Sequence, residues 1–240
     1  MTENTKLTSE IMAMLGAKFM VSTATSGICT SELFPEEQRY VAQAVEKRQA
    51  EFGTARVCAR RALAKFGVPP CSLEPNKDRS PRWPTGFKGS ITHANNFCAV
   101  AVTNSMDISG LGIDIEPATP LQKDLEQLIC TPPELAWLSK FRSKRREILG
   151  KVFFCAKEAF YKCQYESTQV MLDFDDVEIG INYDYGYFKV KKINRIGGQW
   201  QHLYNGIGLF RRVDGLIISA VILPTDPIKL PSQLGWAIAG

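Results

Sequence analysis

Residues 110–116 read Gly-Leu-Gly-Ile-Asp-Ile-Glu, an apolar strand that ends in two carboxylates. Side chains two positions apart in a strand point to the same face, so we expect Asp114 and Glu116 to lie together. Ile113 and Ile115 then point to the other face, toward a core. Two aligned carboxylates suit a hard divalent cation, although such a pair taken alone is more often a solvated strand edge.

A third carboxylate lies on a predicted helix farther along the chain. Apolar residues recur at helical spacing over 144–165, which includes Phe-Cys-Ala-Lys-Glu-Ala-Phe-Tyr-Lys at 154–162. Lys151, Glu158 and Lys162 form one stripe on this helix, and aromatic residues beside the stripe suggest the wall of a cleft. By themselves, Glu158 and Lys162 would be a surface ion pair worth about 0.3 kcal/mol.

Together, the strand and the helix predict a metal-dependent site. Asp114, Glu116 and Glu158 would give Mg²⁺ up to three oxygen ligands and leave positions for water and phosphate. Lys162, one helical turn from Glu158, would neutralise phosphate charge. The combination favours phosphoryl transfer over redox chemistry or peptide cleavage.

The composition indicates a folded protein that is not exported. The chain has 240 residues, of which 45% are hydrophobic, and a formal net charge of +4. Its seven cysteines include no CxxC pair and it has two histidines, which argues against a disulfide framework and a structural zinc site. The longest apolar run, 216–223, is too short to span a bilayer. We expect a cytoplasmic protein without stable membrane insertion.

The predicted elements indicate an α+β fold. A helical pattern covers 34–66, where Gly53 is a candidate break, and further helices are expected from 133 and over 144–165. Strands are predicted at 89–93, 97–103, 108–116, 177–183, 187–193, 200–210 and 216–223. A helical stretch followed by strands occurs twice along the chain. This order favours two α+β halves with antiparallel sheets over a parallel βαβ protein.

Prolines mark the expected limits of these halves. Pro117 and Pro120 interrupt the chain between 1–117 and 118–240, the two expected units. Residues 1–30 are polar and mixed, and we interpret them as a lead-in segment. The tail at 224–240 is rich in proline and is expected to follow the surface.

The first long helix carries a candidate anion site. Arg48, Phe52, Arg56 and Arg60 fall on one i+4 row, which is either an anion site or an ordinary solvated face. Nucleic acid is the rival partner. The small net charge and the lack of exposed aromatic residues interleaved with the arginines argue against it.

Two further clusters are less specific. A glycine precedes three polar groups at a strand end that could cradle a phosphate, although a lone histidine there is usually structural: Ser90, Thr92 and His93. The second cluster lacks the spacing of a calcium loop and is interpreted as a solvated turn: Asp173, Asp175, Asp176 and Glu178.

Several of these stretches resemble one enzyme family. Residues 112–116 followed by 154–162 are similar to the paired signature of 4'-phosphopantetheinyl transferases. Upstream stretches at 47–60, 79–84 and 89–93 resemble the monomeric, double-length class, in particular the enterobactin synthase component D-like subgroup. The resemblance covers roughly residues 45 to 180. Thr92 and Cys155 stand where family members often have serine.

The resemblance implies a fold, a reaction and a set of site residues. It implies two pseudo-twofold-related halves with coenzyme A between them, and transfer of the phosphopantetheine arm to a serine of an apo carrier protein. Mg²⁺ would be held by Asp114, Glu116 and Glu158, with Glu158 as base and Lys162 on the attacked phosphate. The residues implied in binding coenzyme A are Arg48, Arg56, Arg79, Ser90, Thr92, His93, Lys157 and Lys162.

Partners and alternatives follow from the same comparison. We expect acidic acyl, peptidyl or aryl carrier proteins, serving siderophore, nonribosomal peptide, polyketide or fatty acid synthesis, and a monomeric enzyme. Beside Mg²⁺ and Lys162, the pKa of Glu158 is expected below its ordinary value, so positioning of the serine would carry much of the catalysis. The alternative is a noncatalytic coenzyme A- or carrier-binding module of the same fold.

Overall fold

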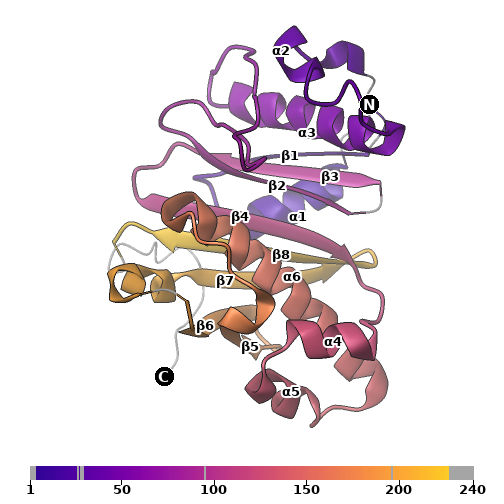
Figure 1. Cartoon of the computed structure of the whole chain (residues 1–240), viewed down its shortest axis with the longest axis vertical. Coiled ribbons are helices and arrows are strands. Elements are labelled where there is room, and N and C mark those ends of the chain that lie inside the picture. Colours follow the sequence, from indigo (N-terminus) through magenta and orange to yellow (C-terminus); the bar gives the residue numbers. More distant parts are fainter. Residues whose placement is uncertain (1–3, 26, 28–29, 95, 196, 227–240) are drawn as a thin grey trace.

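Two antiparallel sheets lie side by side in the computed structural model, which describes residues 4–25, 27, 30–94, 96–195 and 197–226 (Figure 1). The three-stranded sheet has the order β1-β3-β2 and the five-stranded sheet the order β4-β8-β7-β6-β5. Their strands are β1 (Met20–Thr25), β2 (Lys88–Ala94), β3 (Phe97–Thr103), β4 (Ile108–Pro117), β5 (Val177–Asn182), β6 (Tyr187–Ile193), β7 (Ile207–Val213) and β8 (Leu216–Pro224). The expected α+β class with antiparallel sheets is confirmed.

Each sheet carries one long helix. Helix α3 packs on the three-stranded sheet and α6 packs on the five-stranded sheet (Figure 1). The α-helices are α1 (Thr5–Leu15), α2 (Pro35–Gln38), α3 (Glu46–Ala64), α4 (Lys123–Ile129), α5 (Pro132–Leu138) and α6 (Ser143–Thr168). Short 3₁₀ segments are η1 (Thr30–Glu32), η2 (Phe174–Asp176) and η3 (Gly198–Asn205).

Helix α1 covers the opposite face and belongs to the core. Its buried residues Leu7, Ile11 and Met14 pack against β1 and β3 of one sheet and against β4, β7 and β8 of the other. The interpretation of residues 1–30 as a lead-in segment is therefore wrong where the structure describes them, because they supply both α1 and β1. The polar residues between the apolar positions of α1 conceal a helix whose buried stripe is narrow.

Helix α6 lies directly on β4 because glycines leave room for its backbone. A Cβ atom at Gly112 would lie 1.9 Å from the carbonyl oxygen of Ala159 and 2.7 Å from the amide nitrogen of Cys163. At Gly110 it would lie 2.8 Å from the carbonyl oxygen of Cys163. Only glycine permits this approach, which sets the position of α6 relative to the strand.

Two buried hydroxyl groups join the sheets where β2 runs beside β4. The Ser90 hydroxyl accepts a hydrogen bond from the Ile113 amide at 3.0 Å, and the Thr92 hydroxyl accepts one from the Ile115 amide at 3.2 Å. Side chains thus take the place of a backbone ladder at this junction. Strand β4 falls within 1–117 of the sequence-based division, yet it is hydrogen-bonded to β8 in the sheet that 118–240 completes.

Three further expectations about elements are wrong. Gly53 lies within the uninterrupted α3. The segment before β7 is the 3₁₀ segment η3 and not a strand, and α4 was not expected.

No helix among the described residues is long and apolar enough to cross a membrane. The tail expected at 224–240 lies, from 227 onward, outside the described residues.

The structure buries Lys157, which the resemblance implies as a coenzyme ligand, among protein acceptors. Its side chain is 3% exposed, and its ammonium group donates to Glu134 Oε2 at 2.7 Å and to the carbonyl oxygens of Ile129 and Phe174 at 2.8 Å each. These three acceptors use all three donors of the ammonium group. Lys157 therefore joins α4, α5 and η2 beneath α6.

We expect Gly112→Ala to lower the free energy of unfolding by about 2–3 kcal/mol, because the added methyl group meets backbone atoms that no side-chain rotation can move. Gly198→Ala is the matched control, because a Cβ atom there meets nothing within 4 Å. Urea denaturation of both variants measures the difference. Equal stability of the two variants would contradict the close packing of α6 on β4.

We expect Lys157→Ala to cost about 3 kcal/mol of stability, because it leaves the buried Glu134 carboxylate without its cation. The exposed Lys140 provides the control substitution Lys140→Ala, expected within about 0.5 kcal/mol of the wild type. Thermal and chemical denaturation report both. A stable Lys157→Ala protein that loses only coenzyme binding would restore Lys157 to the site.

Candidate active site

Strand β4 and helix α6 bring the predicted acids and lysine together. Asp114 is 4% exposed, and Lys162 Nζ lies 2.7 Å from Asp114 Oδ1. Lys162 also donates to the carbonyl oxygen of Ile113 at 3.3 Å. Ile113 and Ile115 pack in the core with α1. The expected division of β4 into an acidic face and a core face is confirmed, and the acidic face looks toward α6.

Thr92 holds Asp114 from the other sheet. Its hydroxyl donates to Asp114 Oδ1 at 2.9 Å while it accepts from the Ile115 amide. Ser90 and Thr92 are 4% and 2% exposed. Both hydroxyls, which the sequence offers as a phosphate cradle, face β4 instead: both join the sheets, and Thr92 also orients Asp114.

The other two acids complete an electronegative cluster. Glu116 Oε2 lies 3.3 Å from Lys151 Nζ. Burial, and then the charge of Asp114, raise the pKa of Glu116. Burial also raises the pKa of Glu158, with Asp114 and Glu116 adding to the rise against the attraction of Lys162. Without a cation, the pKa of Glu158 thus moves in the direction opposite to that expected beside Mg²⁺.

The residues fit a divalent cation by their chemistry. Asp114 Oδ2 is buried and has no hydrogen-bond partner in the described part of the chain. The Glu158 carboxylate likewise makes no hydrogen bond or ion pair with another described residue. Three carboxylates, one of them with an orphaned oxygen, form the hard oxygen donor set that Mg²⁺ prefers. The oxygens of the three acids do not all lie within 4.8 Å of one another; Asp114 pairs with Lys162 and Glu116 with Lys151.

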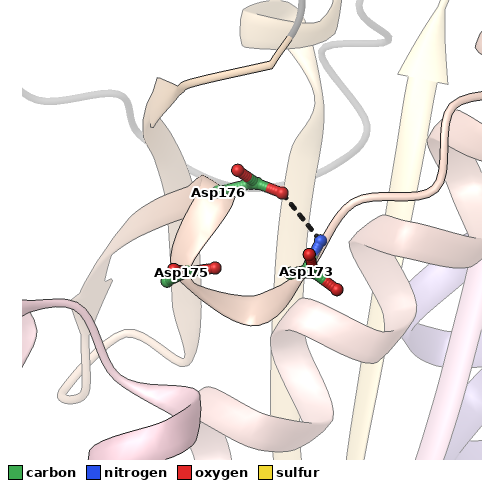
Figure 2. Close-up of side chains that lie close together, drawn as sticks. All are labelled: Asp173, Asp175 and Asp176. Atoms are coloured by element: carbon green, nitrogen blue, oxygen red, sulfur yellow. Dashed lines mark hydrogen bonds between the residues drawn. The ribbon is translucent and has the colours of Figure 1, made fainter.

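A tighter acidic cluster lies at η2, away from these residues. Figure 2 shows Asp173, Asp175 and Asp176, whose oxygens lie within 4.8 Å of one another. Asp176 Oδ2 accepts a hydrogen bond from the Asp173 amide at 2.8 Å, and Arg195 pairs with Asp173 at 2.9 Å and with Asp176 at 3.2 Å. Asp173 and Asp175 are exposed, as expected of a solvated turn, but Asp176 is buried. We therefore interpret the cluster as a turn that is capped by Asp176 and whose negative charge is balanced by Arg195.

The predicted basic residues divide into exposed and buried groups. Arg48, Arg79 and His93 are exposed. Arg56 is 5% exposed, donates to the carbonyl oxygen of Leu73 at 2.6 Å and stacks over the Phe52 ring at 4.0 Å. Burial lowers the pKa of Arg56 to about 10. Of the arginine row on α3, only Arg48 therefore presents an exposed guanidinium, since Arg60 pairs with the buried Glu37.

His93 lies within the field of cations from both halves. Loss of solvating water lowers its pKa, and the charges of Lys162 and Arg48 lower it further against the attraction of Glu51. The end of β2 thus lies near residues of both α3 and α6. Lys151 and Lys162 of α6 pair with the acids of β4, and His93 lies within the electrostatic influence of Lys162 and Arg48. Basic groups gathered in this way can bind a multiply charged phosphate.

Sequence reasoning missed two contacts at this site. The pairing of Lys151 with Glu116 was not foreseen, although Lys151 precedes Glu158 by two helical turns and shares its face. The hydrogen bond from the Tyr165 hydroxyl to Asp78 Oδ2, at 3.1 Å, joins α6 to the loop before β2. The two residues are far apart in the chain, and no local pattern indicates their contact.

Known proteins match this chain over both sheets. One family model, the 4'-phosphopantetheinyl transferase N-terminal domain, matches residues 36–103, and the 4'-phosphopantetheinyl transferase superfamily matches residues 110–206, which include β4 and α6. The 4'-phosphopantetheinyl transferase Svp of Streptomyces mobaraensis is 38% identical over 195 residues, 80% of this chain and 78% of Svp.

Two other proteins extend the comparison. The 4'-phosphopantetheinyl transferase PptT of Mycobacterium tuberculosis is 34% identical over 162 residues, 68% of this chain and 71% of PptT. The solved holo-ACP-synthase of Plasmodium yoelii has a TM-score of 0.37 and 23% identity, covering 50% of this chain and 96% of that one. A structural similarity this low adds nothing to the assignment, which rests on the sequence matches. The chain is a member of the 4'-phosphopantetheinyl transferase family of enzymes.

Proposed function

We propose that this enzyme transfers the 4'-phosphopantetheine arm of coenzyme A to a serine of an apo carrier protein and releases adenosine 3',5'-bisphosphate. The serine oxygen forms a bond to the phosphorus that carries the pantetheine arm. The bond from that phosphorus to the bridging oxygen breaks, and the serine proton passes to a base. The observation that carries the proposal is the buried Asp114, held by Thr92 and Lys162 beside Glu116 and Glu158.

Each residue at the acids has a distinct part in this proposal. Asp114, Glu116 and Glu158 would hold Mg²⁺, which when bound supplies a Lewis acid that neutralises the pyrophosphate. Glu158 has no hydrogen-bond or ion-pair partner among the described residues, so it is available as base for the serine proton, directly or through water. Lys162 lies at the rim of the acids and would contact the phosphate under attack.

The exposed cations would bind the rest of the coenzyme. Arg48, Arg79 and His93 come from three different segments, and their side chains are open to solvent. The buried Arg56 would support this surface through Leu73 and Phe52, because most of its guanidinium is already covered by protein. The coenzyme would then lie across the junction of the two sheets.

Other features of the proposal concern partners. An acidic carrier protein suits the exposed cations and a net charge of +4. We propose a role in siderophore or other nonribosomal peptide or polyketide synthesis and action as a cytoplasmic monomer, since one chain supplies both sheets. Membership of the enterobactin synthase component D-like subgroup stays a prediction.

We expect Glu158→Gln to lower the transfer rate by about 10²–10⁴-fold, because the amide accepts no proton and is a weaker metal ligand. The measurement is the intact mass of a panel of apo carrier proteins after incubation with coenzyme A and Mg²⁺. Glu166→Gln, an exposed acid two turns farther along α6, is the matched control and should retain wild-type activity. A folded wild-type enzyme that binds coenzyme A but modifies no carrier would favour the noncatalytic binding module.

We expect Mg²⁺ to raise the melting temperature by about 5 °C, and the gain should shrink as the pH falls. Burial raises the pKa of Glu116 and of Glu158, so each keeps its proton to a higher pH when folded than when unfolded. Without metal, the contribution of these two glutamates to the free energy of unfolding therefore falls as the pH rises above the ordinary pKa of glutamate. Mg²⁺ binds the ionised carboxylates, so the rise in melting temperature that it causes grows as the pH increases over this same range.

Two substitutions locate the metal responsible for this gain. Asp114→Asn should abolish the Mg²⁺-dependent rise in melting temperature, whereas Asp175→Asn in the η2 cluster should leave it unchanged. If the Mg²⁺-dependent rise in melting temperature is lost only in the Asp175→Asn variant, the metal binds at the η2 cluster, which contradicts this proposal.

A further inference from the structure

A small loop in the segment between α3 and β2 is ordered by its own hydrogen bonds. It spans residues 74–82, and a bridge pairs Pro75 with Pro81. The Asn76 amide donates to the carbonyl oxygen of Ser80 at 2.8 Å, and the Arg82 amide donates to that of Glu74 at 3.0 Å. These bonds close the loop on itself, with residues 77–79 at its tip.

The tip of this loop is tied to α6 by one side chain. Asp78 Oδ1 accepts hydrogen bonds from the Ser80 amide at 2.9 Å and the Ser80 hydroxyl at 2.6 Å. Its second oxygen, Oδ2, accepts from the Tyr165 hydroxyl at 3.1 Å. Among the described residues, this is the only hydrogen bond or ion pair that the tip makes with the C-terminal half of the chain.

Tyr165 lies close to the acids along α6. It follows Lys162 by three residues, which is less than one helical turn, and its ring stacks near that of Tyr161 with centroids 5.5 Å apart. The hydrogen bonds from Ser80, and then that from Tyr165, lower the pKa of Asp78, so the carboxylate is ionised at neutral pH. A hydrogen bond to a charged acceptor is stronger than one between neutral groups.

The backbone conformation of Arg79, the residue that follows Asp78, depends on this hydrogen bond. Arg79 has φ of +72°, a left-handed backbone conformation that a residue with a Cβ atom seldom adopts. Such a conformation persists only where the surrounding structure holds it. Ser80 and Tyr165 hold Asp78, and Asp78 thereby fixes the backbone that carries the exposed Arg79 guanidinium.

We propose that Asp78 and Tyr165 are positioning residues, which fix the 74–82 loop against α6 and so present Arg79 to the anionic groups of coenzyme A. The proposal rests on the proposed function, because it takes coenzyme A as the ligand of Arg79. It assigns Tyr165 no contact with the reacting atoms. The tie joins the N-terminal half of the chain to the helix that carries Glu158 and Lys162.

The test removes only the hydroxyl group that makes the tie. Tyr165→Phe should raise KM for coenzyme A about fivefold and leave kcat within about twofold, because one hydrogen bond to a carboxylate is lost away from the reacting atoms. Limited trypsin digestion reports the loop directly: cleavage after Lys77 and Arg79 should become about fivefold faster. The matched control is Tyr187→Phe on β6, whose hydroxyl accepts a hydrogen bond from Asn182 at 3.3 Å.

A double-substitution cycle tests whether Tyr165 acts through Arg79. In an Arg79→Ala background, Tyr165→Phe should cause no further rise in KM, although cleavage after Lys77 should still accelerate. An equal rise in KM in both backgrounds would show that Tyr165 contacts the coenzyme itself and would overturn the proposal. Faster cleavage with an unchanged KM would show a purely structural tie and would also overturn it.

The outcomes separate this proposal from the proposed function. A wild-type enzyme that fails to bind coenzyme A in calorimetry defeats the proposed function, and the positioning role with it. A wild-type enzyme that binds coenzyme A, together with a Tyr165→Phe variant unchanged in both KM and proteolysis, defeats the positioning role alone.

Discussion

The contact of the α6 backbone with β4, with no side chain between them, is the constraint on which the site depends. It is possible because Gly110 and Gly112 present only hydrogen atoms toward Ala159 and Cys163. The next residues of β4 on the same face are Asp114 and Glu116. Asp114 pairs with Lys162, one turn after Glu158 on α6, and Glu116 pairs with Lys151, two turns before it. A larger residue at either glycine would move the helix away and separate the acids from Lys162.

The junction between the sheets makes a second demand on the same strand. Strand β4 would otherwise leave buried amide groups unpaired on its β2 side, and Ser90 and Thr92 satisfy two of them. Thr92 also orients Asp114, so one hydroxyl group serves both the joining of the sheets and the site. The acids thus lie where the fold is held together, which keeps them rigid and prepared for a ligand.

The local patterns that predicted β4 and α6 succeeded because both elements are long and apolar residues recur along them at strand and helix spacing. The same patterns failed for α1, whose buried stripe is narrow, and for η3, where apolar and aromatic residues suggested a strand. Lys157 and Glu158 are neighbours in sequence, yet they point to different surroundings. Only the packing of α4, α5 and η2 against α6 shows that Lys157 is buried.

Long-range pairings explain the remaining differences in the site. The sequence placed Arg48, Arg56 and Arg60 on one row. The partners of two of them, Leu73 and Glu37, come from other segments, so that Arg56 is buried and Arg60 is paired with a buried acid. The hydrogen bond between Asp78 and Tyr165 likewise could not be predicted from the sequence, because the two residues are far apart in the chain and no local pattern indicates their contact. The residue pattern predicted Asp114, Glu116 and Glu158 as metal ligands, and the resemblance to the family added the role of Glu158 as a base. The structure shows how two sheets and one helix bring these residues together.

The most direct test of the metal site is anomalous diffraction from crystals grown with coenzyme A and Mn²⁺, an oxygen-seeking ion that substitutes for Mg²⁺ and scatters anomalously. The account predicts one strong anomalous peak bounded by the carboxylates of Asp114, Glu116 and Glu158, next to the pyrophosphate of the coenzyme. A peak at Asp173, Asp175 and Asp176 with none beside β4, or a coenzyme bound away from α6, would contradict it.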